Sequence, residues 1–197
     1  RYKGKLIAIT GSVGKTSTKD ILEKMLSAFG LTHSSPKSYN NNLGVSLTLV
    51  NIPKKTEYVI CEIGMNRKGE IEPLSTLVAP DVAIITNISA AHLVSFENLE
   101  EIANEKASIC LGLNKNGLVI FSIDNGFYDL IMNFIDNKKS KSITFGLNSN
   151  ADISLKNISF FNNQSFAKLV IKNKVFSDFK INSLGLHQLL NCLAAVG

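Results

Sequence analysis

The chain has 197 residues, of which 45% are hydrophobic and 19% charged, with a formal net charge of +5. This composition is typical of a folded domain with a sizeable core and excludes a disordered chain. No apolar run approaches the roughly 20 residues that cross a bilayer, and the scattered lysines form no basic stripe with aromatic residues between them, so neither a membrane span nor a nucleic-acid partner is expected.

Strand-like and helix-like patterns alternate over residues 1–148. Residues 5–10 ("KLIAIT") form a short Ile-rich run that predicts a buried strand, and residues 16–29 place their apolar side chains on one helical stripe before Gly30. Further buried strands are predicted at 58–64, 82–88, 118–123 and 142–146, with helices near 99–109 and 126–136. The alternation predicts an α/β fold with a mostly parallel P-loop-type sheet flanked by helices.

The pattern changes after Asn148. The segments "DISLKNISF", "QSFAKLVIK" and "KVFSDFKI" alternate between apolar and polar residues and are separated by turn residues. They predict a small antiparallel β meander over 149–182, followed by the start of a helix in 183–197.

The segment "AITGSVGKTSTKD" (8–20) places a glycine loop between the first strand and the first helix. Amides at a helix start can surround phosphate oxygens, and Gly11 and Gly14 would permit close backbone approach. Lys15 would add a cation, and Thr16 a hydroxyl for Mg²⁺. The general pattern G-x-x-x-x-G-K-[ST] fails, however, because Ile9 holds the place of its first glycine. A plain turn with a Ser or Thr cap is the alternative.

Polar residues follow the next predicted strands. Glu62 ends one strand, Asn87 and His92 follow another, and Lys106 lies on the helix after it. Ligands of open parallel sheets bind at the carboxyl ends of the strands, where a carboxylate can hold Mg²⁺ directly or through water. Taken singly, each residue also has an ordinary interpretation: a solvated carboxylate, a structural histidine or a surface lysine.

The three cysteines, Cys61, Cys110 and Cys192, lie far apart in apolar context. Their number and spacing fit neither a disulfide framework nor a zinc site. Buried, reduced thiols in a cytoplasmic protein are therefore expected.

Five segments together resemble the Mur ligases, in the branch that joins D-alanyl-D-alanine to UDP-N-acetylmuramoyl-tripeptide. They are "ITGSVGKTSTKD", "YNNNLGVSLTL", "EIGMNRKGEI", "TNISAAHLVSFENLEEIANEK" and "GLHQLLNCLAA". The short G-x-x-G-K-[ST] form of that family's ATP loop matches the spacing that the general pattern excludes. The resemblance implies that residues 1–197 are the central ATP-binding domain of a cytoplasmic, monomeric, three-domain ligase. An amino-terminal UDP-sugar domain and a carboxyl-terminal ligase domain would lie outside it.

The resemblance also implies residue roles. Lys15, His92 and Lys106 would be catalytic, with Lys106 carbamylated by CO₂. Thr16, Glu62, His92 and the Lys106 carbamate would bind two Mg²⁺ ions, and Asn41 and Asn42 would face the peptide substrate. The ATP-binding residues would be Gly11, Ser12, Val13, Gly14, Lys15, Thr16, Ser17, Asn87, His187 and Asn191. Two alternatives stay open: another ligase of this superfamily, adding a different amino acid or joining glutamate to folate, and a nucleotide-binding module without ligase chemistry.

Overall fold

One nine-stranded sheet forms the centre of the molecule, with the strand order β2-β3-β1-β4-β5-β6-β7-β8-β9. The computed structural model describes residues 2–90 and 95–197. The strands are β1 (Lys5–Thr10), β2 (Thr32–Ser34), β3 (Tyr58–Glu62), β4 (Val82–Ile85), β5 (Leu118–Ser122), β6 (Lys141–Gly146), β7 (Ile153–Phe161), β8 (Gln164–Ile171) and β9 (Lys174–Ile181). The helices are α1 (Lys15–Leu26), α2 (Asn42–Val50), α3 (Ile71–Val78), α4 (Leu99–Ala107), α5 (Tyr128–Lys138) and α6 (Leu186–Val196), with 3₁₀ turns at Ser108–Gly112 and Ile123–Asn125.

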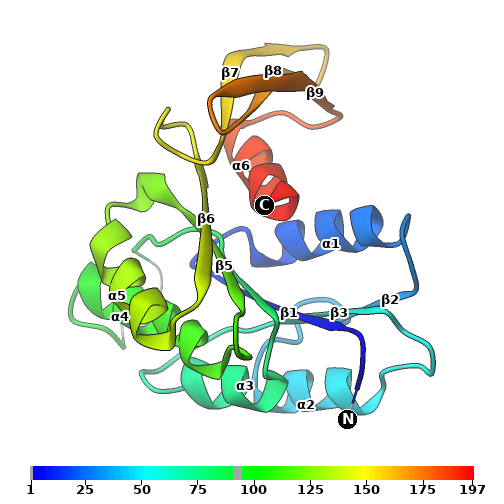
Figure 1. Cartoon of the computed structure of the whole chain (residues 1–197), viewed down its shortest axis with the longest axis vertical. Helices are drawn as coiled ribbons and strands as arrows, with labels where there is room; N and C mark the ends of the chain where they lie inside the picture. The colour runs from blue at the N-terminus through cyan, green and yellow to red at the C-terminus, as the bar shows by residue number, and fades with distance from the viewer. Residues whose placement is uncertain (1, 91–94) are drawn as a thin grey trace.

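The parallel strands are apolar on both faces because helices cover both. Successive strand residues point to opposite sides of a sheet. Ala8 therefore joins the core beneath α2, α3, α4 and α5, whereas Ile7 and Ile9 join the core beneath α1 and α6. Figure 1 shows these two helix layers on either side of the sheet. The predicted parallel α/β fold is confirmed, and no described helix has the length and apolarity that a membrane crossing requires.

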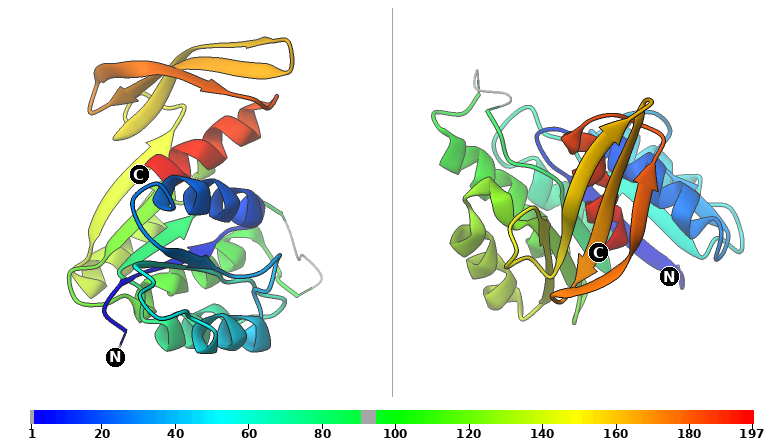
Figure 2. Two further views of the ribbon diagram at one scale, coloured as in Figure 1. Left: turned by 90° about the vertical axis from the view of Figure 1, so that its right-hand side faces the viewer. Right: turned by 90° about the horizontal axis from the view of Figure 1, so that it is seen from above.

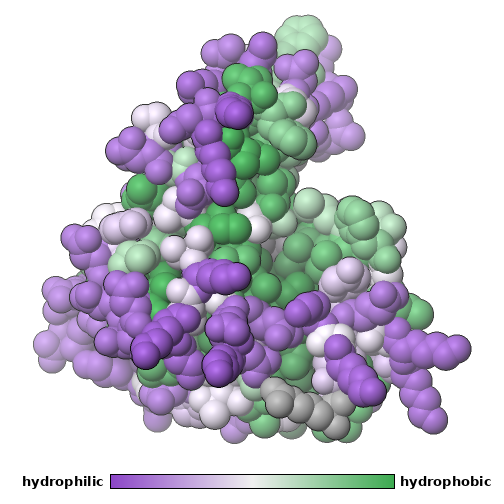
Figure 3. Space-filling view, in the orientation of Figure 1, coloured by the Kyte–Doolittle hydropathy of each residue, from purple (hydrophilic) through white to green (hydrophobic). Residues whose placement is uncertain are grey.

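The antiparallel meander extends the main sheet instead of forming a separate one. β6 and β7 pair in parallel through Phe145 and Ile153, and β7, β8 and β9 then pair antiparallel. This three-stranded end projects beyond the helices (Figures 1 and 2). On the face shown in Figure 3, a band of hydrophobic side chains runs down from the meander between hydrophilic ones, and hydrophilic side chains cover much of the lower body. The predicted meander is confirmed.

The structure corrects several predicted boundaries and adds three elements. α1 ends at Leu26, so Phe29 lies outside the helix and is 77% exposed instead of joining a buried stripe. Strand β2 has only three residues, too few for a periodic signal. Helices α2 and α3 were also not predicted. α2 contains a glycine and β-branched residues, and α3 has Pro73 in its first turn, where the missing N–H costs little.

Glu105 of α4 fixes the start of α3. Its carboxylate accepts hydrogen bonds from the backbone N–H groups of Gly69, Glu70 and Ile71 at 2.8, 2.9 and 2.9 Å. These amides have no partner inside the helix, and Glu105 itself is buried. A negative charge at the positive end of α3 thus joins two helices that are distant in sequence.

We predict that Glu105→Ala lowers the free energy of unfolding by about 2–3 kcal/mol, because three amides lose a charged acceptor. Urea denaturation measures the change. Glu100→Ala is the matched control: this residue is exposed in the first turn of the same helix, and its loss should cost about 0.5 kcal/mol or less. Equal costs for the two variants would contradict the capping role.

Candidate functional site

The β1–α1 loop leaves the start of α1 open. Gly14 precedes the helix with φ of +87°, in the left-handed region, and no described side chain caps this end. The first turn also contains no acidic residue. The unpaired amides and the helix dipole therefore present a positive surface, which is suited to an anion.

The end of strand β4 holds this loop in place. The hydroxyl of Thr86 donates to the carbonyl of Val13 at 2.7 Å, and the backbone N–H of Ser12 donates to the carbonyl of Asn87 at 2.8 Å. Ser12 Oγ donates to the carbonyl of Ser89 and accepts from its N–H. The loop is thus preorganised by the neighbouring strand, which lowers the conformational cost of binding a ligand.

Lys15 lies across the loop that precedes it. Its Nζ donates to the carbonyl of Gly11 at 2.8 Å. Burial lowers the pKa of Lys15, while the negative charge of Glu62 acts in the opposite direction. The cation is therefore held beside the open amides of α1.

Glu62, at the end of β3, is 1% exposed, and both of its carboxylate oxygens are hydrogen-bonded. Thr16 Oγ1 donates to Oε2 at 2.8 Å, and Asn40 Nδ2 donates to Oε1 at 2.8 Å. A hydroxyl and a carboxylate are hard oxygen ligands that fit Mg²⁺, which commonly uses one or two protein ligands together with water and phosphates. No cluster of three His, Cys, Asp or Glu residues that could hold a metal ion occurs among the residues described.

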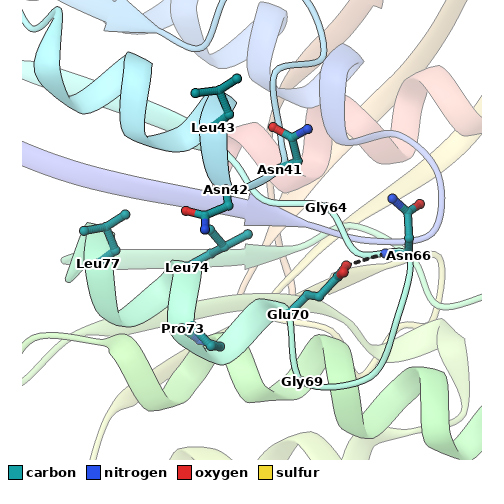
Figure 4. A pocket seen from close by; sticks show the side chains of 10 residues that line it. All are labelled: Asn41, Asn42, Leu43, Gly64, Asn66, Gly69, Glu70, Pro73, Leu74 and Leu77. Carbon is teal, nitrogen blue, oxygen red and sulfur yellow. Dashed lines mark hydrogen bonds between the residues drawn. The ribbon is translucent and has the colours of Figure 1, made fainter.

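Two cavities adjoin this site. The smaller, of about 190 Å³, is lined by Lys15, Asn40, Asn41, Gly64, Met65, Asn66 and Glu70. The larger, of about 620 Å³, lies between α2 and α3 and shares four of these residues: Asn41, Gly64, Asn66 and Glu70. In Figure 4, Asn42 of α2 points toward Leu74 of α3, and Glu70 accepts from the backbone N–H of Asn66. The two cavities therefore adjoin, and Lys15 lines the smaller of them.

Lys106 of α4 is buried near the same loop, with only 1% of its surface exposed. Burial, and secondarily the charge of Lys15, lower its pKa to about 7, although Glu105 acts in the opposite direction. A lysine with that pKa carries a substantial neutral fraction near neutral pH, and a neutral amine is nucleophilic.

Helix α6 reaches the loop from the carboxyl-terminal end of the chain. A Cβ at Gly14 would lie 2.3 Å from Asn191 Oδ1, so the buried Asn191 side chain packs directly on this glycine. His187 lies one turn earlier on α6 and is exposed. Residues four apart share a helix face, so His187 lies on the same face of α6 as Asn191, which contacts the β1–α1 loop.

Residues 9–197 match the family described as the Mur ligase middle domain. The chain belongs to the Mur ligase family. It is 39% identical over 186 residues to the UDP-N-acetylmuramoyl-tripeptide–D-alanyl-D-alanine ligase of Rickettsia prowazekii. The matched region covers 94% of this chain and 41% of that protein. The chain thus spans about two fifths of the length of this relative.

Solved Mur ligase structures share the fold. MurF from Acinetobacter baumannii superposes with a TM-score of 0.90 at 32% identity, covering 98% of this chain and 41% of that one. The Thermotoga maritima MurF ligase in complex with ADP has a TM-score of 0.88 at 26% identity, covering 99% and 44%.

The structure brings together most of the residues expected from the resemblance to the Mur ligases. The glycine loop, Lys15, Thr16, Glu62 and Asn191 meet at the start of α1, and Lys106 is close enough for its pKa to be affected by Lys15. His92 lies outside the described residues, and His187 is at the exposed start of α6.

Asn41 and Asn42 line the larger cavity, and Asn41 also has a structural role. Its Oδ1 accepts from the N–H of Gly44 at 2.9 Å and caps α2. Sequence reasoning missed Asn40, the residue of the "NNN" run that contacts Glu62, and Thr86, which supports the loop. Neither a triplet of identical residues nor a threonine after a strand carries a signal that would identify these contacts.

We predict that Gly14→Ala destabilises the chain more than Gly126→Ala does. Both glycines have positive φ, at +87° and +76°, so both variants incur the left-handed penalty of roughly 1–2 kcal/mol. A Cβ at Gly126 meets no atom within 4 Å, whereas one at Gly14 collides with Asn191. Chemical denaturation of both variants tests this. In the Gly14→Ala background, Asn191→Ala should recover part of the additional loss in the free energy of unfolding. If the two single-variant losses simply add in the double variant, the contact between these residues is contradicted.

We predict that Lys106→Met raises the thermal midpoint most below pH 7. The pKa of Lys106 is about 7 in the folded chain and 10.5 for a free lysine. Between these two pH values, Lys106 is protonated in the unfolded chain but largely neutral in the folded chain. Wild-type stability therefore rises with pH across this window, and the advantage of methionine shrinks toward pH 10. Melting curves of both proteins at pH 6, 8 and 9.5, in CO₂-free buffer, measure the difference. A pH-independent difference would contradict burial of the ammonium group.

Proposed function

We propose that this chain is the ATP-binding domain of a ligase that joins D-alanyl-D-alanine to UDP-N-acetylmuramoyl-tripeptide. The observation that carries the proposal is the convergence of Lys15, Thr16 and Glu62 at the open start of α1. Lys15 lines a cavity of about 190 Å³ that adjoins one of about 620 Å³. Curated relatives with 31–39% identity over 94–98% of this chain are named for this reaction.

ATP would bind with its phosphates at the β1–α1 loop. The loop from Gly11 to Ser17 would surround the phosphates. The Ser12 N–H already donates to the carbonyl of Asn87, so the free amides at the start of α1 and the Lys15 ammonium group would neutralise the phosphate charge. Asn87, His187 and Asn191 would lie near the rest of the nucleotide. Support comes from the uncapped helix start, and from Gly11 and Gly14, whose positive φ lets the loop turn into α1 while it packs against Thr86 and Asn191. Asn87 Oδ1 is buried without a hydrogen-bond partner among the described residues, so it offers an acceptor.

Thr16 and Glu62 would hold Mg²⁺, and His92 with Lys106 would serve a second ion. Bound Mg²⁺ would supply positive charge to the phosphoryl oxygens. For Lys106, the neutral amine would attack the carbon of CO₂ and lose one proton, which yields a carbamate with one negative charge. Burial of Lys106 and its pKa of about 7 support this, because the reaction requires an unprotonated nitrogen.

The reaction would proceed in two steps. The tripeptide carboxylate would attack the γ-phosphorus of ATP, releasing ADP and forming an acyl phosphate. The amine of D-alanyl-D-alanine would then attack the carbonyl carbon, lose a proton and displace phosphate. The first step brings two anions together, so Lys15 and the loop amides would chiefly neutralise charge and align the reactants.

The peptide substrate would occupy the larger cavity. Asn41, Asn42 and Asn66 offer amide groups there, and Leu74 and Leu77 offer apolar surface. This cavity shares four lining residues with the one that Lys15 lines, so a peptide carboxylate there could meet the γ-phosphate. The rest of a longer, monomeric polypeptide would supply a UDP-sugar domain and a carboxyl-terminal ligase domain. A cytoplasmic location would suit an ATP-dependent enzyme whose three cysteines are free and buried.

A phosphate-release assay on the chain with its flanking segments restored tests this function. We predict turnover that requires ATP, Mg²⁺, UDP-N-acetylmuramoyl-tripeptide and D-alanyl-D-alanine together. Lys15→Ala should lower the rate by about 10²-fold or more, because a cation on the phosphates is lost. Lys24→Ala, at an exposed lysine on the same helix, is the matched control.

Other outcomes of the assay would support one of the two alternative functions. Turnover with a single amino acid and a shorter nucleotide-linked peptide, or with glutamate and folate, would indicate another ligase of the superfamily. Nucleotide binding without phosphate release for any substrate pair would indicate a nucleotide-binding module.

A further inference from the structure

Asn40 is the one described side chain besides Thr16 that donates a hydrogen bond to the carboxylate of Glu62. Its Nδ2 lies 2.8 Å from Oε1, while Thr16 occupies Oε2. Asn40 also lines the cavity that Lys15 lines. The amide therefore borders the space next to the Glu62 carboxylate and fixes which oxygen faces α1.

The backbone of Asn40 is held as firmly as its side chain. Its carbonyl accepts from the N–H of Gly64 at 2.8 Å, just beyond the end of β3. A Cβ at Gly64 would lie 2.7 Å from the Asn40 amide, so the absence of a side chain at Gly64 leaves the room that the amide occupies. Asn40 thus binds the end of β3 through two hydrogen bonds, one from its side chain to Glu62 and one from the Gly64 N–H to its carbonyl.

The segment that leads to Asn40 is anchored by a buried lysine. Lys19 of α1 is 3% exposed, and its Nζ donates to the carbonyls of Ser35 and Lys37 at 2.8 and 2.6 Å. A carboxylate partner, Asp20, lies 3.3 Å away but is largely exposed. The two carbonyl contacts therefore satisfy an ammonium group that would be costly to bury alone.

The same segment also holds the Glu62 backbone. Ser35 Oγ accepts from the N–H of Glu62 at 3.0 Å, and the N–H of Ser35 donates to the carbonyl of Ile60 at 3.0 Å. Residues 35–40 consequently fix Glu62 twice, through its main chain at Ser35 and through its side chain at Asn40.

We propose that Asn40 is a positioning residue that presents Glu62 to Mg²⁺, and that Lys19 anchors the segment from which it acts. The proposal rests on the proposed function, in which Thr16 and Glu62 hold the ion. The Thr16 hydroxyl contacts Oε2 on the α1 side, while the Asn40 contact lies on Oε1 and keeps the carboxylate plane in place. Groups that orient a metal ligand commonly affect metal affinity strongly without touching the metal.

Calorimetric titration of this 197-residue chain with ATP, in the presence and absence of Mg²⁺, tests the proposal. We predict that Asn40→Ala reduces the Mg²⁺-dependent gain in ATP affinity by roughly tenfold and leaves Mg²⁺-free binding unchanged. Ser38→Ala, at an exposed position of the same segment, should behave as wild type. In a Glu62→Gln background, where the carboxylate is already lost, Asn40→Ala should add little, and this coupling separates positioning from a general loss of structure.

Lys19→Met provides a second variant that leaves the Asn40 side chain intact. It should reproduce part of the loss of Mg²⁺ dependence, and melting curves show whether either variant is folded. Full Mg²⁺ dependence in Asn40→Ala would overturn the positioning role while leaving the proposed function standing. Full dependence in Lys19→Met would overturn the anchoring role. A wild-type chain that binds ATP equally with and without Mg²⁺ would overturn the metal site, and with it this proposal.

Discussion

A carboxylate that is almost fully removed from solvent sits where β3, α1 and the segment 35–40 meet. Burying the Glu62 charge would cost several kcal/mol without compensation, and hydrogen bonds from Thr16 and Asn40 offset this cost. Each donor comes from a different part of the chain, so the bonds form together only when these parts are correctly placed. The start of α1 is thereby tied to the end of the neighbouring strand.

The parallel sheet explains why the other groups arrive at the same place. β1 pairs with β3 on one side and β4 on the other, with Ile9 opposite Glu62 and Thr10 opposite Ile85. Three strands therefore end at one level, and the residues after them share one edge. This edge carries two partly or fully buried lysines, Lys15 and Lys106. The charge of Lys15 contributes to lowering the pKa of Lys106, and a bound anion would act in the opposite direction.

Helix α6 adds a long-range connection. The chain leaves the α/β body at β6, forms the meander and returns through α6 to place Asn191 on Gly14. α6 also packs against α1 in the core formed with Leu22, Leu189 and Leu193. The conformation of the loop consequently depends on residues almost 180 positions away, which couples its geometry to folding of the whole domain.

The amino-acid sequence by itself determined the fold class, most strand positions, the meander and the glycine loop, because apolar periodicity and backbone chemistry are local properties. It also indicated Lys15 and Thr16, which directly follow the glycine loop, and Glu62, a carboxylate at the end of an apolar run. Only the tertiary structure decided that Asn40 binds Glu62 while Asn41 caps α2, that Thr86 supports the loop, and that Glu105 caps α3. It also decided that α2 and α3 are helices. Hydrogen bonds between side chains and distant elements depend on how strands and helices pack, and neighbouring asparagines are distinguished only by the directions that this packing gives them.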